Sequence, residues 1–120
     1  MFRGLIIKES LSDQSFWEQL KITKEETWDI ENSTEGQPSV WNVAWFEIKD
    51  SGAEIFSKEL SKALHVGKWY VDLTSETEKI IVFPNQIYRY KKGDVLERSK
   101  AEEFGLGIGI PKSQLDWKEA

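Results

Sequence analysis

Few side chains in this sequence could carry acid–base chemistry near neutral pH. His65 is the only histidine in the 120 residues, and an imidazole titrates in that range. Asp72 or Glu47 would be the carboxylate that orients the imidazole. Tyr70 stands two positions before Asp72 and shares its face of a predicted strand. His65, Tyr70 and Asp72 are therefore our candidate residues for a small-molecule enzyme site.

A structural interpretation of His65 is simpler. The residue ends the second predicted helix, where a partly cationic imidazole is stabilised by the negative end of the helix dipole. No serine nucleophile motif accompanies it. We therefore expect a non-catalytic protein, and the enzyme remains the alternative hypothesis.

Three glycines near the end of the chain resemble a phosphate-binding loop. Gly105, Gly107 and Gly109 alternate with apolar residues in "EEFGLGIGI". A phosphate loop follows a strand and opens a helix, whose free N–H groups bind the anion. Here the glycines follow a predicted helix, so the pattern indicates a helix end, with Gly105 at the C′ position and Leu106 near Ala101.

The composition argues against metal, cofactor and nucleic-acid sites. There are no cysteines, and no segment has the alternating acidic ligands of a calcium loop. The acidic pairs at 25–26 and 102–103 are typical of solvated faces. The net charge of −5 disfavours binding to a phosphate backbone. We expect no metal, cofactor or nucleic-acid partner.

The apolar segments are all short. The start of the chain has an apolar run only from Leu5 to Ile7, too short for a signal peptide. No segment approaches the roughly 20 apolar residues that cross a bilayer. We expect no membrane partner and a cytoplasmic location.

Tryptophan is unusually frequent, with six residues. Trp17, Trp28, Trp45 and Trp69 lie on apolar faces of predicted elements, which favours burial in the core. Aromatic side chains on strands also suit recognition of a ligand or partner protein. The candidates for that role are Trp41, Trp45, Tyr88 and Tyr90.

Hydrophobic periodicity predicts about six strands and three helices over one domain, residues 1–120. The strands cover residues 2–8, 22–31, 40–48, 68–74, 79–84 and 87–91, with a polar loop at 32–39. A short helix follows Ser12, a second begins at a capping box of Ser51 and Glu54 and ends at Gly67, and a third runs from Asp94 to about Phe104.

The order of these elements predicts an α+β fold. The first six elements match the βαββαβ pattern of ferredoxin-like domains, which place both helices on one face of the sheet. The last two strands would add a hairpin, and the third helix would follow at the C-terminus. We expect a mainly antiparallel sheet.

The strand from Val40 to Ile48 is apolar on both sides, so both faces of the sheet must be covered. The second face is covered by the C-terminal helix and tail, closed by a partner subunit, or open as a ligand cleft. A homodimer with Trp41 as its aromatic anchor is the form of association that we favour.

Five phrases, spread over most of the chain, carry a resemblance. They are "ETWDI", "QPSVW", "KWYVDL", "IVFPNQIYRYKKGD" and "GIPKSQLDW". Together they resemble small single-domain bacterial proteins of uncharacterised function. The resemblance implies a cytoplasmic bacterial protein and assigns no chemistry to any residue.

Overall fold

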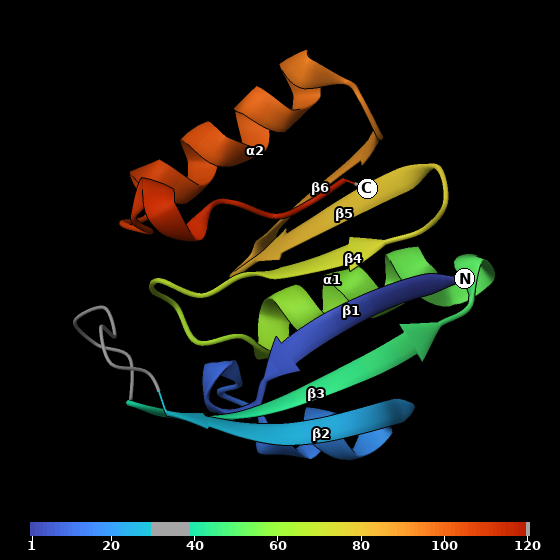
Figure 1. Ribbon diagram of the computed structural model, residues 1–120, viewed down its shortest axis with the longest axis vertical. Helices are drawn as coiled ribbons and strands as arrows, with labels where there is room; N and C mark the ends of the chain where they lie inside the picture. The colour runs from blue at the N-terminus through green and yellow to red at the C-terminus, as the bar shows by residue number, and fades with distance from the viewer. Residues whose placement is uncertain (30–38, 120) are drawn as a thin grey trace.

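The computed structural model describes residues 1–29 and 39–119 (Figure 1). The six strands of the described ranges are β1 (Phe2–Ile7), β2 (Ile22–Asp29), β3 (Val40–Ile48), β4 (Val71–Thr74), β5 (Glu78–Phe83) and β6 (Gln86–Lys91). Their helices are α1 (Ala53–Ala63), α2 (Val95–Gly107) and the short 3-10 helices η1 (Lys8–Ser10), η2 (Gln14–Gln19), η3 (Asp50–Gly52) and η4 (Lys112–Gln114). Apart from Ser39, the predicted loop 32–39 lies outside the described residues.

The strands form one sheet in the order β2-β3-β1-β4-β5-β6. Every neighbouring pair is antiparallel, and β1 lies near the middle, between β3 and β4 (Figure 1). The α+β class and the antiparallel sheet are therefore confirmed. The strand predicted from its β-branched and aromatic residues at Val40–Ile48 is β3.

The ferredoxin-like topology is not confirmed, because the strand order differs from that fold. The predicted first helix is absent as an α-helix: residues 8–20 contain only η1 and η2. The two α-helices lie on opposite faces of the sheet. Ile80 of β5 packs in a cluster with Leu60 of α1, whereas Ile81 packs in a second cluster with Ala101 of α2. Successive residues of a strand point to opposite faces, so this pattern separates the helices.

The first face of the sheet is covered by α1 and η2. Phe56 of α1 links the layers, because its ring centroid lies 5.3 Å from that of Phe16 in η2 and 5.4 Å from that of Phe46 in β3. Leu60 is fully buried between them. This face matches the amphipathic pattern of the predicted second helix.

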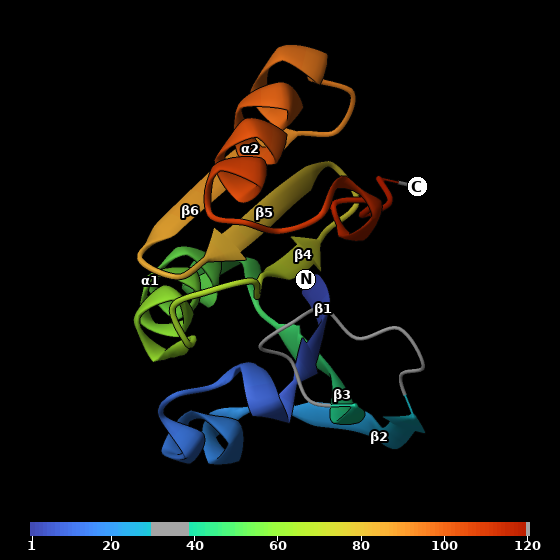
Figure 2. The ribbon, with the colours of Figure 1, turned by 90° about the vertical axis from the view of Figure 1, so that its left-hand side faces the viewer.

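The second face is covered over β5 and β6 by α2 and by the tail that follows it, residues 108–119, which runs back across the sheet (Figures 1 and 2). Ile110, Leu115 and Trp117 of the tail are buried against Ile81 and Phe83 of β5. Neither α-helix of the described ranges is long and apolar enough to cross a membrane.

Helix α2 begins as expected and ends three residues later than predicted. Asp94 accepts a hydrogen bond from the backbone N–H of Glu97 at 3.1 Å. At the other end, the N–H of Gly109 donates to the carbonyl of Leu106 and the N–H of Ile110 to that of Gly105. This is a Schellman motif, with Gly109 at C′ and a φ of +95°. The glycine-rich segment is a helix end, but Gly109 occupies the position predicted for Gly105.

Helix α1 differs from its prediction at both ends. The capping box of Ser51 and Glu54 does not form, because η3 occupies residues 50–52 and Gly52 is the N-cap without a side-chain hydrogen bond. The helix ends at Ala63 rather than near Gly67, and Leu64 makes a β-bridge with Leu11. This bridge replaces the last helical turn.

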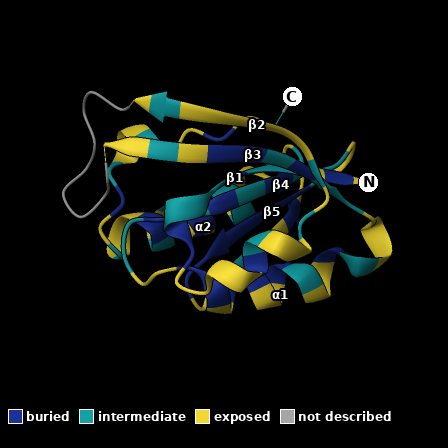
Figure 3. Cartoon of the chain, turned by 90° about the horizontal axis from the view of Figure 1, so that it is seen from below, coloured by how far each residue is buried: buried dark blue, intermediate teal, exposed yellow. Residues whose placement is uncertain are grey.

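Burial varies strongly across the sheet (Figure 3). From Lys79 to Phe83, β5 is buried on both faces, as expected for a strand between two layers. Most of β2 is exposed, and its charged residues Lys24, Glu25 and Glu26 protect this edge from pairing with other strands.

Candidate functional site

The second face of the sheet is covered only in part. The buried cluster beneath α2 and the tail draws its strand residues from β5 and β6, with Tyr70 just before β4. Within the described chain, no residue of β1, β2 or β3 belongs to this cluster. The second face of these three strands carries instead a groove that runs beside the tail.

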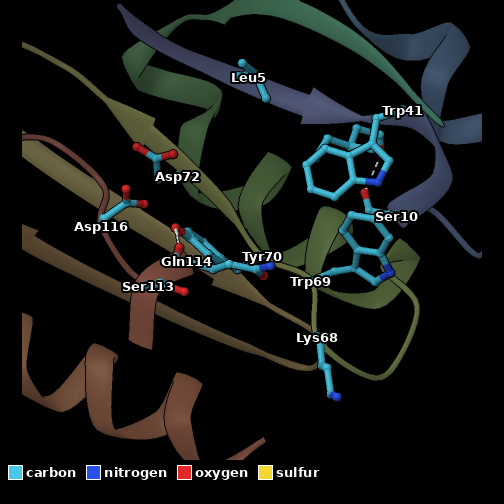
Figure 4. Close-up of a pocket in the computed structure, with 11 residues that line it drawn as sticks. Leu5, Ser10, Trp41, Lys68, Trp69, Tyr70, Asp72, Ser113, Gln114 and Asp116 are labelled. Atoms are coloured by element: carbon cyan, nitrogen blue, oxygen red, sulfur yellow. Dashed lines mark hydrogen bonds between the residues drawn. The ribbon is translucent and has the colours of Figure 1, made fainter. Parts of the chain in front are cut away.

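The closed end of the groove is a pocket of about 280 Å³ between β1 and the tail (Figure 4). Its main lining residues are Leu5, Trp41, Trp69, Tyr70, Asp72 and Asp116. Asp72 and Asp116 lie at one end of the pocket, and Trp41 and Trp69 lie at the other (Figure 4). The pocket thus combines apolar and aromatic walls with a few polar groups, which is typical of binding sites.

The pocket opens into a shallow trough of about 1090 Å³ along the same face. Leu5, Asp72 and Asp116 line both spaces and so mark their junction. The trough adds Trp28 and Trp45 from the exposed edge of the sheet. We call the pocket and the trough together the tryptophan groove.

Asp72 is held in place by a buried lysine. Lys79 of β5 is fully buried, and its Nζ donates to Oδ2 of Asp72 at 2.7 Å and to Oγ1 of Thr74 at 2.5 Å. A buried charge is tolerated only when it is paired and hydrogen-bonded. The pair therefore fixes one carboxylate oxygen of Asp72, whose side chain remains about one-third exposed in the groove.

Tyr70 acts in the groove as a neutral hydroxyl. It donates a hydrogen bond to the backbone carbonyl of Gln114. Burial raises the pKa of Tyr70, and the charges of Asp72 and Asp116 raise it further, against smaller opposing effects that include Arg98. The phenol stays protonated near neutral pH and is therefore unsuited to act as a general base.

The tryptophans of the groove form two pairs. The ring centroids of Trp41 and Trp69 are 5.5 Å apart, and those of Trp28 and Trp45 are 6.0 Å apart with nearly perpendicular planes. Trp28 also donates its indole N–H to Glu26 at 2.9 Å. These contacts orient the rings before any ligand binds. Of the tryptophans expected in the core, Trp69 is buried, whereas Trp17, Trp28 and Trp45 are half-buried.

The structure brings together only part of the candidate enzyme site. Tyr70 and Asp72 share the pocket. His65 is exposed just beyond α1, is not among the lining residues of the groove, and donates its backbone N–H to the carbonyl of Ser10 at 2.8 Å. The imidazole therefore does not complete a proton-transfer site with the other two residues.

The four aromatic candidates for binding also separate. Trp41 and Trp45 line the tryptophan groove. Tyr90 is buried beneath the tail, where its hydroxyl bonds with Glu119 and Trp117. Tyr88 is half-buried under α2, against Phe83 and Phe104.

Sequence reasoning missed Lys79 and Asp116. Lys79 had a signal in the sequence. It lies on the same face of its strand as Ile81 and Phe83, and the strand is apolar on both faces, so a buried lysine could be expected there. Asp116 had none, since the path of the tail across the sheet depends on distant contacts.

The chain matches no family model, and comparisons with curated proteins and solved structures give no match either. Among the described residues, no three His, Cys, Asp or Glu side chains are grouped so as to hold a metal ion.

Proposed function

We propose that this protein is a non-catalytic binding module that captures a partner protein, or a second copy of itself, in the tryptophan groove. One observation carries the proposal. Helix α2 and the tail cover only one half of the second face of the sheet, and the other half carries the tryptophan groove. The proposal includes the cytoplasmic location that the sequence predicts.

Three features of the groove support binding of a macromolecule. Its tryptophans are held by ring contacts, which lowers the entropy that an interface loses when it forms. Large aromatic residues beside a polar rim are typical of interface hot spots. The trough also extends along several strands, which suits a protein segment better than a compact molecule.

The alternative, an enzyme that uses Tyr70, Asp72 and His65, has less support. His65 does not line the groove, the Tyr70 hydroxyl is bound to Gln114, and Asp72 is bound to Lys79. An aspartate and a neutral phenol are too few groups for a recognisable reaction.

Trp41→Glu tests the proposed function, with Ile55→Glu as its matched control. Ile55 is 67% exposed on α1, on the opposite face of the sheet. We expect the wild type to self-associate in sedimentation at high micromolar concentration, or to retain a partner from a bacterial lysate. Loss of an aromatic anchor should weaken that binding about 30-fold or more, and the control should bind normally.

Circular dichroism and urea unfolding must show that both variants fold, since Trp41 packs against Trp69. A partner that binds Trp41→Glu as tightly as the wild type would contradict the proposal. A wild type that is monomeric and captures nothing would also contradict it.

A further inference from the structure

We infer that the closed end of the tryptophan groove binds a basic side chain, arginine or lysine, carried by an extended segment of a partner protein. The inference deepens the proposed function and rests on it. It names the chemistry of the partner, which the binding proposal leaves open.

Two carboxylates meet where the pocket joins the trough. Asp72 keeps one oxygen on Lys79, and its side chain is still one-third exposed. Asp116 is exposed and forms no ion pair within residues 1–29 and 39–119. Burial raises the pKa of Tyr70 and both carboxylates add to the effect, so their charges act inside the pocket, whose lining also includes Lys68. A cation at this junction would meet an unpaired charge.

Aromatic rings enclose the other end of the same pocket. A guanidinium or ammonium group is attracted to the face of an indole ring. The protein already uses this contact twice beside the groove: Lys24 lies 4.8 Å from the ring of Trp45, and Arg98 lies 4.9 Å from that of Trp117. A basic side chain that enters from the trough would pass Asp72 and Asp116 with its apolar stem along Leu5. Its charged end would lie against the rings of Trp41 and Trp69, inside the pocket that both carboxylates line.

The charges favour a different protein over a second copy of this chain. In a symmetric dimer both subunits use the same surface, so the acidic residues of both grooves would be brought into one interface. The net charge of −5 also repels a second copy and attracts a basic partner. The open trough provides room for the backbone on either side of one inserted side chain.

The test measures binding of short peptides to the full-length protein labelled with ¹⁵N. The probes are acetyl-Ala-Ala-X-Ala-Ala-amide with arginine, norleucine or glutamate at X, and n-butylguanidinium as a free cation. Titrations follow the backbone and indole N–H signals, with sedimentation under the same conditions. The variants are Asp116→Asn and, as matched control, Glu59→Gln, an exposed carboxylate on α1.

We expect the arginine peptide to shift the indole and backbone signals of the groove in a saturable way. It should bind about tenfold more tightly than the norleucine peptide, and the glutamate peptide should not bind. Asp116→Asn should weaken binding of the arginine peptide about two- to fivefold, and the difference should shrink as salt is added. Glu59→Gln should leave its binding unchanged.

Several outcomes would overturn the inference. If the norleucine and arginine peptides bound the groove with equal affinity, the inferred preference for a cation would be wrong. The proposed binding function would still stand. Equal binding of n-butylguanidinium and the arginine peptide would point to a small organic cation instead of a protein segment. Signal shifts outside the groove, indifference to Asp116→Asn, or a groove closed by self-association would each reject it.

Discussion

Three hydrogen-bond donors converge on the carboxylate of Glu119 and hold the end of the tail. The Tyr90 hydroxyl donates at 2.9 Å, the Gly93 N–H at 2.8 Å and the Arg98 guanidinium at 2.8 Å. Burial raises the pKa of Glu119, but the hydrogen bonds from Gly93, Arg98 and Tyr90 outweigh burial and leave it below its ordinary value. The ionised carboxylate is therefore a stabilising contact.

Glu119→Gln should lower the free energy of unfolding at pH 7 by about 1–3 kcal/mol. Because the folded pKa lies below the unfolded value of about 4.5, this stabilisation is present above pH 4.5 and is lost as the pH falls through the folded pKa. Urea unfolding of wild type and variant at pH 7 and pH 3 checks this. A difference that is as large at pH 3 as at pH 7 would contradict it.

The buried pair of Lys79 and Asp72 leads to an asymmetric prediction. Asp72→Asn removes the charge that compensates a fully buried ammonium and should cost about 2–4 kcal/mol. Lys79→Met replaces the lysine with an apolar side chain of similar length and leaves Asp72 access to water, so it should cost less. Chemical denaturation compares the two, and equal or reversed losses would show that the lysine is not strongly desolvated.

Helix α2 packs closely on the tail because one of its residues lacks a side chain. A Cβ at Gly105 would lie 2.7 Å from Cδ2 of Leu115 and 3.3 Å from Cε1 of Phe83. At Gly107, in the last turn of the same helix, a Cβ would meet no atom within 4 Å. The two glycines therefore differ in packing while both are helical.

Gly105→Ala should destabilise the protein by about 1–2 kcal/mol, because overpacking against buried Leu115 outweighs the helix propensity of alanine. Gly107→Ala is the matched control and should stabilise it by up to about 1 kcal/mol. Thermal unfolding measures both changes. A stabilised Gly105→Ala would mean that the tail moves aside at little cost.

The two hydrophobic cores share strand β5, which couples the layers on both faces of the sheet. Ile80 and Val82 of this strand belong to the first core, and Ile81 and Phe83 to the second. The radius of gyration of 13.5 Å is close to the ~13.6 Å expected for a compact chain of this length. Both observations suit a single cooperative unit.

Leu60→Ala in the first core and Ile110→Ala in the second should each cost about 2–5 kcal/mol and lower the midpoint of the same transition. Tryptophan fluorescence and far-UV circular dichroism should give coincident unfolding curves for both variants. If Ile110→Ala separated the curves, the tail and α2 would unfold on their own, and the single-domain prediction would fail.

The sequence by itself determined the elements whose signals are local. The alternation from Val40 to Ile48 predicted β3, and Asp94 with Glu97 predicted the start of α2. It also indicated that the glycine-rich segment ends a helix, although the position of the Schellman motif moved from Gly105 to Gly109. Capping and strand periodicity involve residues a few positions apart, so neighbouring side chains are enough to specify them.

Only the tertiary structure decided the strand order, the opposite faces of α1 and α2, and the groove. The sequence proposed Tyr70 and Asp72 for an enzyme site with His65, and Trp41 and Trp45 for binding. The fold places these four residues along one groove, where the tail adds Asp116. The tertiary structure also buries Tyr90 and leaves His65 exposed to solvent. Strands such as β5 are apolar on both faces, so the sequence pattern alone does not say which helix packs on which face. That choice depends on how well buried apolar surfaces fit together, and those surfaces come from residues far apart in the chain.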